Sequence, residues 1–205
     1  MEARGLAWRR QNAAHRPVWV AASTHEGEEE IVLDAHRRLL GRLPDALLIL
    51  VPRHPHRFDA VRELLAKRGE AFLSRSSGEP VTTTAKILLG DTMGELMMFY
   101  AAADAAFVAG SLVPIGGHNL LEPASLGRPV LTGPHNFNSQ EIADLFIEAG
   151  AARVVAGARE LADGVMTLLE DAQLRIRMGE AGRAVLDANR GAIDRLLALV
   201  DPLLD

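Results

Sequence analysis

Polar segments rich in Gly, Pro and His hold most of the side chains in this sequence that could bind a ligand. Each follows directly after a short apolar run, and together they comprise Ser23–Gly27, Pro52–Pro55, Gly90–Glu95, Gly110–Ser111 with Pro114–Pro123, and Gly133–Asn138. An apolar run followed by such a segment is typical of a strand and the loop at its carboxyl end. Because ligands bind beyond the carboxyl ends of the strands in an open parallel sheet, the pattern predicts a site at one sheet edge.

The most specific segment is Gly116–Pro123, which reads GGHNLLEP. Its two glycines allow a tight backbone turn, and a helix that begins near Asn119 would present its N-terminus to the strand ends. Glu122 would then lie in the first helical turn, where its carboxylate can accept two hydrogen bonds from a ribose diol. The alternative is that Glu122 only stabilises the helix start, and we favour contact with a ligand.

Arg53 is the second candidate, because it follows an apolar run through Pro52, whose ring stiffens the backbone. A guanidinium held in this way can grip an anionic oxygen bidentately, whereas the alternative is a surface ion pair. Arg53 is therefore a candidate to bind an anionic group of the ligand.

Thr92 and Glu95 have the spacing of a capping box, in which Ser or Thr is followed three residues later by Glu. The pair predicts a helix with Met93 and Gly94 in its first turn. The free backbone N–H groups of that turn would be a natural seat for an anion or for the polar edge of a base.

Ser23 and Glu26 show the same spacing ahead of the acidic run Glu28–Glu30. We interpret that run as stabilising a helix start through the helix dipole. Ser23, with Thr24 and His25, also lies where a substrate would sit, so either role remains open for it.

Histidines and signature motifs set the limits on other chemistries. His25, His54, His118 and His135 could converge on one rim, but there is no H-E-x-x-H motif or compact His/Asp cluster, so we expect no metal. The sequence also lacks a P-loop, a G-x-S-x-G elbow, and a G-x-G-x-x-G after the first apolar run. These absences argue against a kinase, a serine hydrolase and a dinucleotide-dependent dehydrogenase.

Length and composition indicate one globular domain. The 205 residues are 48% hydrophobic, 24% charged and 4% aromatic, and there is no cysteine. The net charge of -5 does not indicate a nucleic-acid-binding protein, which would carry an excess of positive charge. No apolar run approaches the roughly 18–20 residues that span a bilayer. Residues 1–17 lack the apolar core of a signal peptide, and we expect them to form a lead-in with a helix from Glu2 to Asn12, ahead of a domain over 18–205.

The elements that must position these residues alternate along the chain. We expect strands at Val18–Ala22, Ala46–Val51, Ala71–Ser74, Ala85–Leu89, Ala105–Ala109, Pro129–Thr132 and Ala152–Val155. The expected helices are Glu28–Arg42, Arg57–Arg68, Met93–Ala102, Leu120–Leu126, Ser139–Glu148, Ala158–Glu170, Ala172–Ala188 and Ala192–Leu199. Short apolar strands that alternate with helices predict an α/β fold, a doubly wound parallel sheet with helices on both faces.

Long strings in the sequence resemble one family. AASTHEGEEE, LILVPRHPHRF, GDTMGEL and FVAGSLVPIGGHNLLEPASLGRPVLTGPHNFN are similar to the bacterial 3-deoxy-D-manno-octulosonic acid (Kdo) transferases, which are glycosyltransferases of the GT-B class. The resemblance runs from about Val18 to Val155, and the GGHN-x-LEPA string is its most specific part. It implies the Rossmann-like C-terminal domain of a GT-B enzyme.

The resemblance also implies which residues contact the donor nucleotide. Carried over to this chain, the family pattern places CMP contacts at Pro52, Arg53, Met93, Gly94, Glu95, Asn119, Leu120, Leu121 and Glu122. Further possible contacts with the donor are Ser23, His54, Ser111, Gly117 and His118. Leu120 stands where the family commonly has Pro.

The family transfers Kdo from CMP-Kdo to the lipid A precursor at the cytoplasmic face of the inner membrane, and we expect no cofactor or metal. Its N-terminal half, with the membrane anchor, the acceptor site and the catalytic base, has no counterpart here. We therefore expect this chain to be soluble, to bind the donor and to be inactive alone. The rival interpretations are a GT-B enzyme or epimerase that uses a UDP-sugar, and a non-catalytic nucleotide-binding module.

Overall fold

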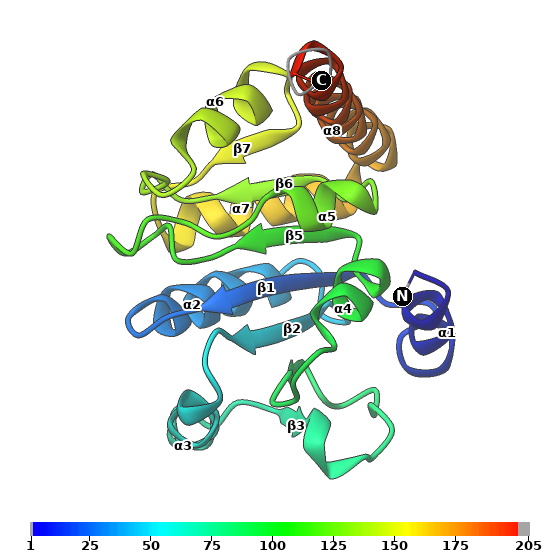
Figure 1. The fold of residues 1–205 in the computed structure, drawn as a ribbon. Helices are drawn as coiled ribbons and strands as arrows, with labels where there is room; N and C mark the ends of the chain where they lie inside the picture. The colour runs from blue at the N-terminus through cyan, green and yellow to red at the C-terminus, as the bar shows by residue number, and fades with distance from the viewer. Residues whose placement is uncertain (1, 201–205) are drawn as a thin grey trace.

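A seven-stranded, all-parallel sheet forms the centre of the computed structural model, which describes residues 2–200 and the side chains of residues 2–189 (Figure 1). The strands are β1 (Val18–Thr24), β2 (Leu47–Pro52), β3 (Phe72–Ser74), β4 (Ile87–Leu89), β5 (Ala105–Val108), β6 (Val130–Thr132) and β7 (Ala152–Val154). Their order is β3-β4-β2-β1-β5-β6-β7. Strands β2, β3 and β4 lie on one side of β1, and β5, β6 and β7 lie on the other. The pair β1 and β5 therefore marks the switch point in strand order, where such sheets bind ligands. All seven predicted strands are confirmed.

Helices cover both faces of the sheet, as predicted (Figure 1). They are α1 (Glu2–Asn12), α2 (Glu28–Leu40), α3 (Phe58–Lys67), α4 (Leu96–Ala102), α5 (Leu121–Ser125), α6 (Gln140–Glu148), α7 (Ala158–Glu170) and α8 (Ala172–Val200), with short 3₁₀ turns η1 (Pro55–Arg57) and η2 (Arg75–Ser77). The two helices expected over 172–199 are one continuous helix, α8. A glycine inside a helix costs only about 1 kcal/mol, so Gly191 does not break it.

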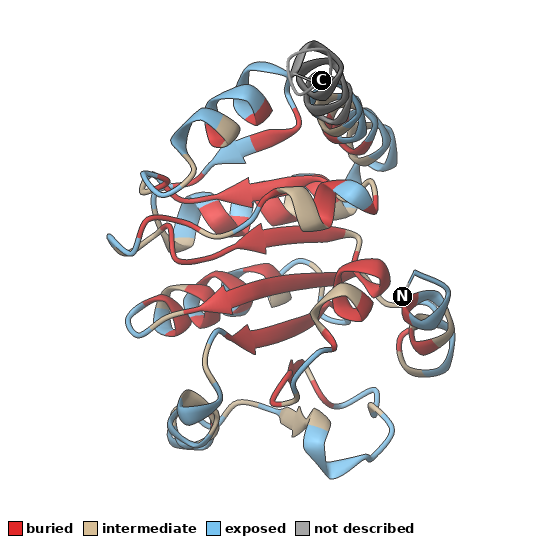
Figure 2. Cartoon of the chain, viewed as in Figure 1, coloured by how far each residue is buried: buried red, intermediate tan, exposed pale blue. Residues whose placement is uncertain are grey.

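Alternation along β1 explains the two layers. Trp19 and Ala21 pack in one cluster with α2, α3 and α7, whereas Val18 and Val20 pack in another with α1 and α4. Successive side chains of a strand point to opposite faces, and the central strands are buried on both (Figure 2).

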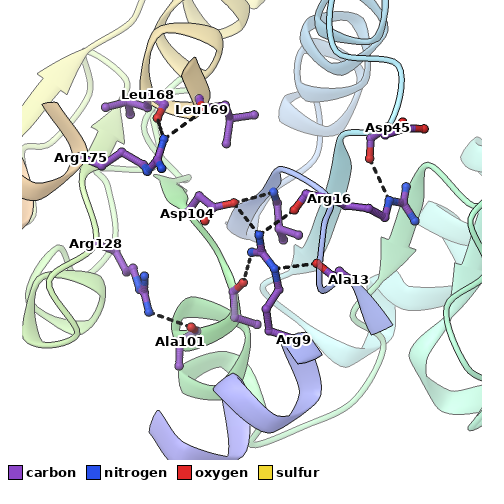
Figure 3. A network of polar contacts seen from close by, with 12 residues as sticks. Arg9, Ala13, Arg16, Asp45, Ala101, Asp104, Arg128, Leu168, Leu169 and Arg175 are labelled. Atoms are coloured by element: carbon purple, nitrogen blue, oxygen red, sulfur yellow. Dashed lines mark hydrogen bonds and ion pairs between the residues drawn. The ribbon is translucent and has the colours of Figure 1, made fainter. Parts of the chain in front are cut away.

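The lead-in helix α1 packs onto α4. Trp8 meets the ring of Phe99 edge-on at 6.2 Å between ring centroids. Arg9 donates hydrogen bonds to the carbonyl of Ala102 at 2.6 Å and to Asp104 at 2.9 Å, within the network of Figure 3. The start of the chain is therefore tied to the same face of the sheet as α4. Between residues 2 and 200, none of the helices combines the length and apolarity that a membrane span requires.

Candidate functional site

Two adjoining cavities open at the carboxyl edge of the sheet, and we call them together the edge cleft. The larger, of about 200 Å³, is lined by Ser23, Arg53, Leu96, Tyr100, His118, Asn119 and Glu122. The smaller, of about 90 Å³, is lined by Ser23, Val51, Pro52, Arg53, Phe58, Thr92, Met93, Gly94 and Leu96. Ser23, Arg53 and Leu96 border both. Residues from the ends of β1, β2, β4 and β5 thus meet at one edge, as the sequence predicts.

Ser23 lies at an irregular step in β1. The register between β1 and β2 shifts between Ala22 and Thr24, and Ser23 has a φ of 60°. Such a backbone conformation is costly for a residue with a side chain and is concentrated at functional sites. The bulge turns the end of β1 into the cleft, and the predicted capping box between Ser23 and Glu26 is absent because α2 begins after Gly27.

Arg53 reaches the cleft from the end of β2. Its backbone N–H donates to the carbonyl of Thr24 at 3.0 Å, which fixes its position relative to β1. In the described part of the chain no carboxylate lies within 4.0 Å of its guanidinium, in contrast to most neighbouring arginines. A surface ion pair therefore does not explain Arg53.

Glu122 lies in the first turn of α5 and borders the larger cavity, as predicted. Burial raises the pKa of its carboxyl group, while the positive charge of Arg53 and a hydrogen bond with Asn119 act to lower it. A half-buried carboxylate with an incomplete set of partners is suited to accept hydrogen bonds from a ligand.

The turn before α4 differs from its prediction. The helix begins at Leu96, so Met93 and Gly94 precede it and do not form its first turn. Gly94 has a φ of 75° with open space where a side chain would project, and Met93 is 67% exposed. The Met93–Gly94 backbone is therefore accessible from the cleft without being a helix N-terminus.

The carboxylate of Glu95 does not face the cleft. It accepts hydrogen bonds from Arg75, from Arg4 of α1 at 2.7 Å, and from the Thr92 hydroxyl at 2.6 Å. The predicted pairing of Thr92 with Glu95 is thus present, but as a contact between side chains rather than as a helix cap. Both carboxylate oxygens are therefore occupied by partners within the protein, and the contact of Glu95 with the nucleotide stays a prediction.

Three of the four candidate histidines converge beside Arg53. The Nε2 atoms of His25 and His118 are 2.8 Å apart, so one ring donates and the other accepts, and the ring of His54 meets His25 edge-on. Burial, followed by the charges of His25, Arg53 and His54, lowers the pKa of His118 to about 4. In residues 2–200 no group of three or more His, Cys, Asp or Glu side chains is arranged to hold a metal ion.

Glu28 is a residue whose role the sequence interpretation missed. Its fully buried carboxylate accepts four backbone N–H bonds, from His25, Gly110, Ser111 and Leu112, at 2.7–3.0 Å. Successive N–H groups of a loop make an anion-binding concavity, and here the protein's own carboxylate fills it. The expectation of a merely dipole-stabilising acidic turn is wrong for Glu28. The usable signal was the three-residue spacing from His25 to Glu28.

Glu29, in the same first turn of α2, is also buried. Its carboxylate accepts hydrogen bonds from the Thr24 hydroxyl at 3.1 Å and from Arg57 at 3.2 Å. It therefore ties the start of α2 to the end of β1 and to η1, which flank the cleft.

Ser111, Gly117 and Leu120 also do not line the cleft. The buried Ser111 hydroxyl donates to the Val108 carbonyl and accepts from the Gly133 N–H, so it is committed within the protein. A side chain at Gly117 would begin 2.6 Å from Asn136, so this glycine allows two loops to pack. Leu120 is 2% exposed and belongs to the core.

Leu121 and Tyr100 line two different cavities. Leu121 borders a separate, more apolar cavity of about 420 Å³ that shares Asn119 and Glu122 with the cleft. Tyr100 lines the cleft itself, and burial, followed by the charge of Glu122, raises the pKa of its hydroxyl. Sequence reasoning missed Tyr100 because it lies within the apolar run LMMFYAA.

A parallel, doubly wound sheet defines a Rossmann-like domain, and its cleft at the switch point combines a half-buried carboxylate, an arginine and an accessible glycine turn. These are the features of a nucleotide-binding domain. No family model matches the chain.

Comparison with curated relatives identifies the family more specifically than the fold does. The chain is 49% identical over 191 residues to 3-deoxy-D-manno-octulosonic acid transferase of Haemophilus influenzae, covering 93% of this chain and 45% of that protein. It is 42% identical over 205 residues to the transferase of Bordetella pertussis, covering 98% and 47%. The chain thus spans about half the length of these relatives.

Solved structures agree with this result. The C-terminal CMP-Kdo binding domain of WaaA from Acinetobacter baumannii superposes with a TM-score of 0.86 and 34% identity, covering 90% of this chain and 97% of that one. The C-terminal domain of the glycosyltransferase LpcC from Francisella tularensis, at a TM-score of 0.63 and 17% identity, shares the fold. The chain belongs to the Kdo transferase family, and it corresponds to the C-terminal domain of the proteins in that family.

Proposed function

We propose that this domain binds CMP-Kdo and forms the donor half of an enzyme that transfers Kdo to the lipid A precursor in lipopolysaccharide biosynthesis. The observation that carries the proposal is the edge cleft, where Arg53, Glu122 and the Met93–Gly94 turn meet around shared cavities. The likeness to a solved domain described as CMP-Kdo binding supports the same donor.

Each part of CMP has a partner of matching chemistry in this proposal. Glu122 accepts hydrogen bonds from the ribose diol, because its carboxylate is half-buried and incompletely paired. The exposed Met93–Gly94 backbone contacts the polar edge of the cytosine. Arg53 binds the phosphate, for which a guanidinium without a carboxylate partner is suited.

The sugar would lie on the histidine side of Arg53. His118 lines the cleft, and the ring of His25 lies against the rings of both His118 and His54. We assign the Kdo carboxylate to His118 and His54, because the N–H of an imidazole can donate a hydrogen bond to an anion.

In the transfer, the bond between the anomeric carbon and the CMP phosphate oxygen breaks, and the acceptor oxygen bonds to the opposite face of that carbon. CMP leaves as an anion, and the positive charge of Arg53 stabilises the charge that develops on its phosphate. The acceptor hydroxyl must be positioned and must lose its proton on the far side. We assign those tasks, and the location at the inner membrane, to the part of the relatives that this chain does not span.

Calorimetric titration with CMP, and with UMP as the control, tests the proposal. We expect CMP to bind at least about tenfold more tightly, because UMP leaves a base-reading group unpaired. A preference for UMP would favour a UDP-sugar enzyme of the same fold. Absence of binding to either nucleotide by the folded domain would contradict the proposal that this chain forms a complete nucleotide site.

A further inference from the structure

The turn that borders the smaller cavity is held at its first end by Asp91, whose side chain is almost completely buried. One carboxylate oxygen accepts from the Ser76 N–H at 2.8 Å, and the other accepts from the Ser76 hydroxyl at 2.7 Å. Arg62 of α3 donates to that second oxygen at 2.8 Å. Asp91 thereby fixes the exit of β4 against η2.

The second end of the turn is held by Glu95. Arg75 of η2 donates to both oxygens of this carboxylate, from Nε at 2.9 Å and from a terminal nitrogen at 3.0 Å. A bidentate arginine–carboxylate pair fixes orientation as well as distance. Burial acts to raise the pKa values of Asp91 and Glu95, but hydrogen bonds, chiefly from Ser76 and Arg75 respectively, outweigh it and lower them, so both groups are ionised at neutral pH.

Between these two ends, Thr92 bonds only the Glu95 carboxylate, and within the described residues no hydrogen bond holds Met93 or Gly94. A side chain at Gly94 would meet open space, and Met93 is largely exposed. The neighbouring strands β3 and β4 have three residues each, and β3 forms the sheet edge, so few ladder hydrogen bonds stabilise the region. The conformation of the Met93–Gly94 backbone therefore depends on the two anchored carboxylates and on η2.

We propose that Arg75 and Ser76 are positioning residues for the base-binding turn: through Glu95 and Asp91 they fix Met93–Gly94 and thereby set the affinity for the cytosine of the donor. The inference rests on the proposed function for the identity of the ligand. It also reassigns Glu95, whose side chain supports the turn instead of touching the nucleotide.

The decisive comparison uses CMP and ribose 5-phosphate, which keeps the sugar and phosphate but lacks the base. For Arg75→Ala we expect CMP affinity to fall about tenfold and ribose 5-phosphate affinity to change less than about twofold, because only the base contact depends on the turn. Arg75→Lys should restore part of the loss, since a point charge replaces the bidentate fork. Ser76→Ala should act in the same direction as Arg75→Ala.

Arg42→Ala is the matched control, because Arg42 forms an exposed ion pair with Glu170 and neither residue lines the cleft. It should leave both affinities unchanged. An equal loss of CMP and ribose 5-phosphate binding in Arg75→Ala would indicate a general structural defect and overturn the inference. Unchanged CMP affinity would overturn it as well.

Amide hydrogen exchange keeps this inference separable from the proposed function. Exchange at Gly94 and Glu95 should be faster in Arg75→Ala and Ser76→Ala than in the wild type or Arg42→Ala, with no ligand present. If the wild type bound no CMP, the proposed function would fail while faster exchange would still support the anchoring of the turn. Unchanged exchange in both variants would refute the anchoring whatever the nucleotide results.

Discussion

Glu28 and Glu122 are carboxylates in the first turns of two helices at the same sheet edge, but their surroundings give them opposite tasks. Glu28 is fully buried and accepts four backbone N–H bonds, so it holds the loop after β5 in place. Glu122 is half-buried with its pKa raised, chiefly by burial. A carboxylate saturated by the protein is structural, whereas one with spare acceptors can hold a ligand.

Glu122→Ala and Arg53→Ala should each weaken CMP binding by about 1–3 kcal/mol, because each removes a hydrogen bond that involves a charged group. Titration calorimetry on the folded variants measures the effect. Glu141→Ala provides the control, since Glu141 is an exposed carboxylate in the first turn of α6. Wild-type affinity in Glu122→Ala, with the fold intact, would remove its proposed contact with the ribose.

Glu28→Gln should lower the free energy of unfolding by at least about 2 kcal/mol, because an amide nitrogen would then face backbone donors inside the protein. Urea unfolding checks this value. The exposed neighbour Glu30 gives the comparison, and Glu30→Gln should change stability by less than about 0.5 kcal/mol. Equal stability of the two variants would mean that the buried carboxylate does not hold the loop.

Among the secondary-structure elements, β1, α2 and the segment before β4 are joined by two hydrogen bonds of the buried His36 side chain, which we call the His36 relay. The indole N–H of Trp19 in β1 can only donate, so Nδ1 of His36 in α2 accepts that bond at 3.1 Å. Nε2 must then carry the proton and donate to the Lys86 carbonyl, before β4, at 2.9 Å. Only neutral His36 fits both bonds, and burial lowers its pKa to about 4.

This relay predicts a pH dependence of stability. The unfolded chain gains a proton at His36 below its ordinary pKa near 6.5, whereas the folded chain does not until about pH 4. Stability is therefore complete above pH 6.5 and falls as the pH drops from 6.5 to 4, by roughly 3 kcal/mol from this group. His36→Gln can keep both bonds but does not titrate, so its unfolding free energy should fall less over this window. Parallel curves for the two proteins would contradict the relay.

For the whole molecule, the apolar runs and the polar segments that follow them were enough to predict the sheet, its helices and the edge where the cleft lies. The sequence predicted that α4 begins at Met93, whereas it begins at Leu96. The reason is a tertiary contact, because Arg4 and Arg75, which are remote in sequence, bind the Glu95 carboxylate that the local spacing assigns to a helix cap. The side chains of Ser111 and Leu120 are buried, which the motif could not show because it reports chain position and not the direction of a side chain. The strand order, with β3 outside β4, has no local signature.

A crystal structure of the domain with CMP would show whether the edge cleft holds the donor nucleotide. We predict the ribose hydroxyls within hydrogen-bond distance of Glu122, the phosphate against Arg53, and the cytosine edge against the Met93–Gly94 backbone. CMP bound elsewhere, for example in the apolar cavity beyond Leu121, with the cleft unchanged, would contradict the account.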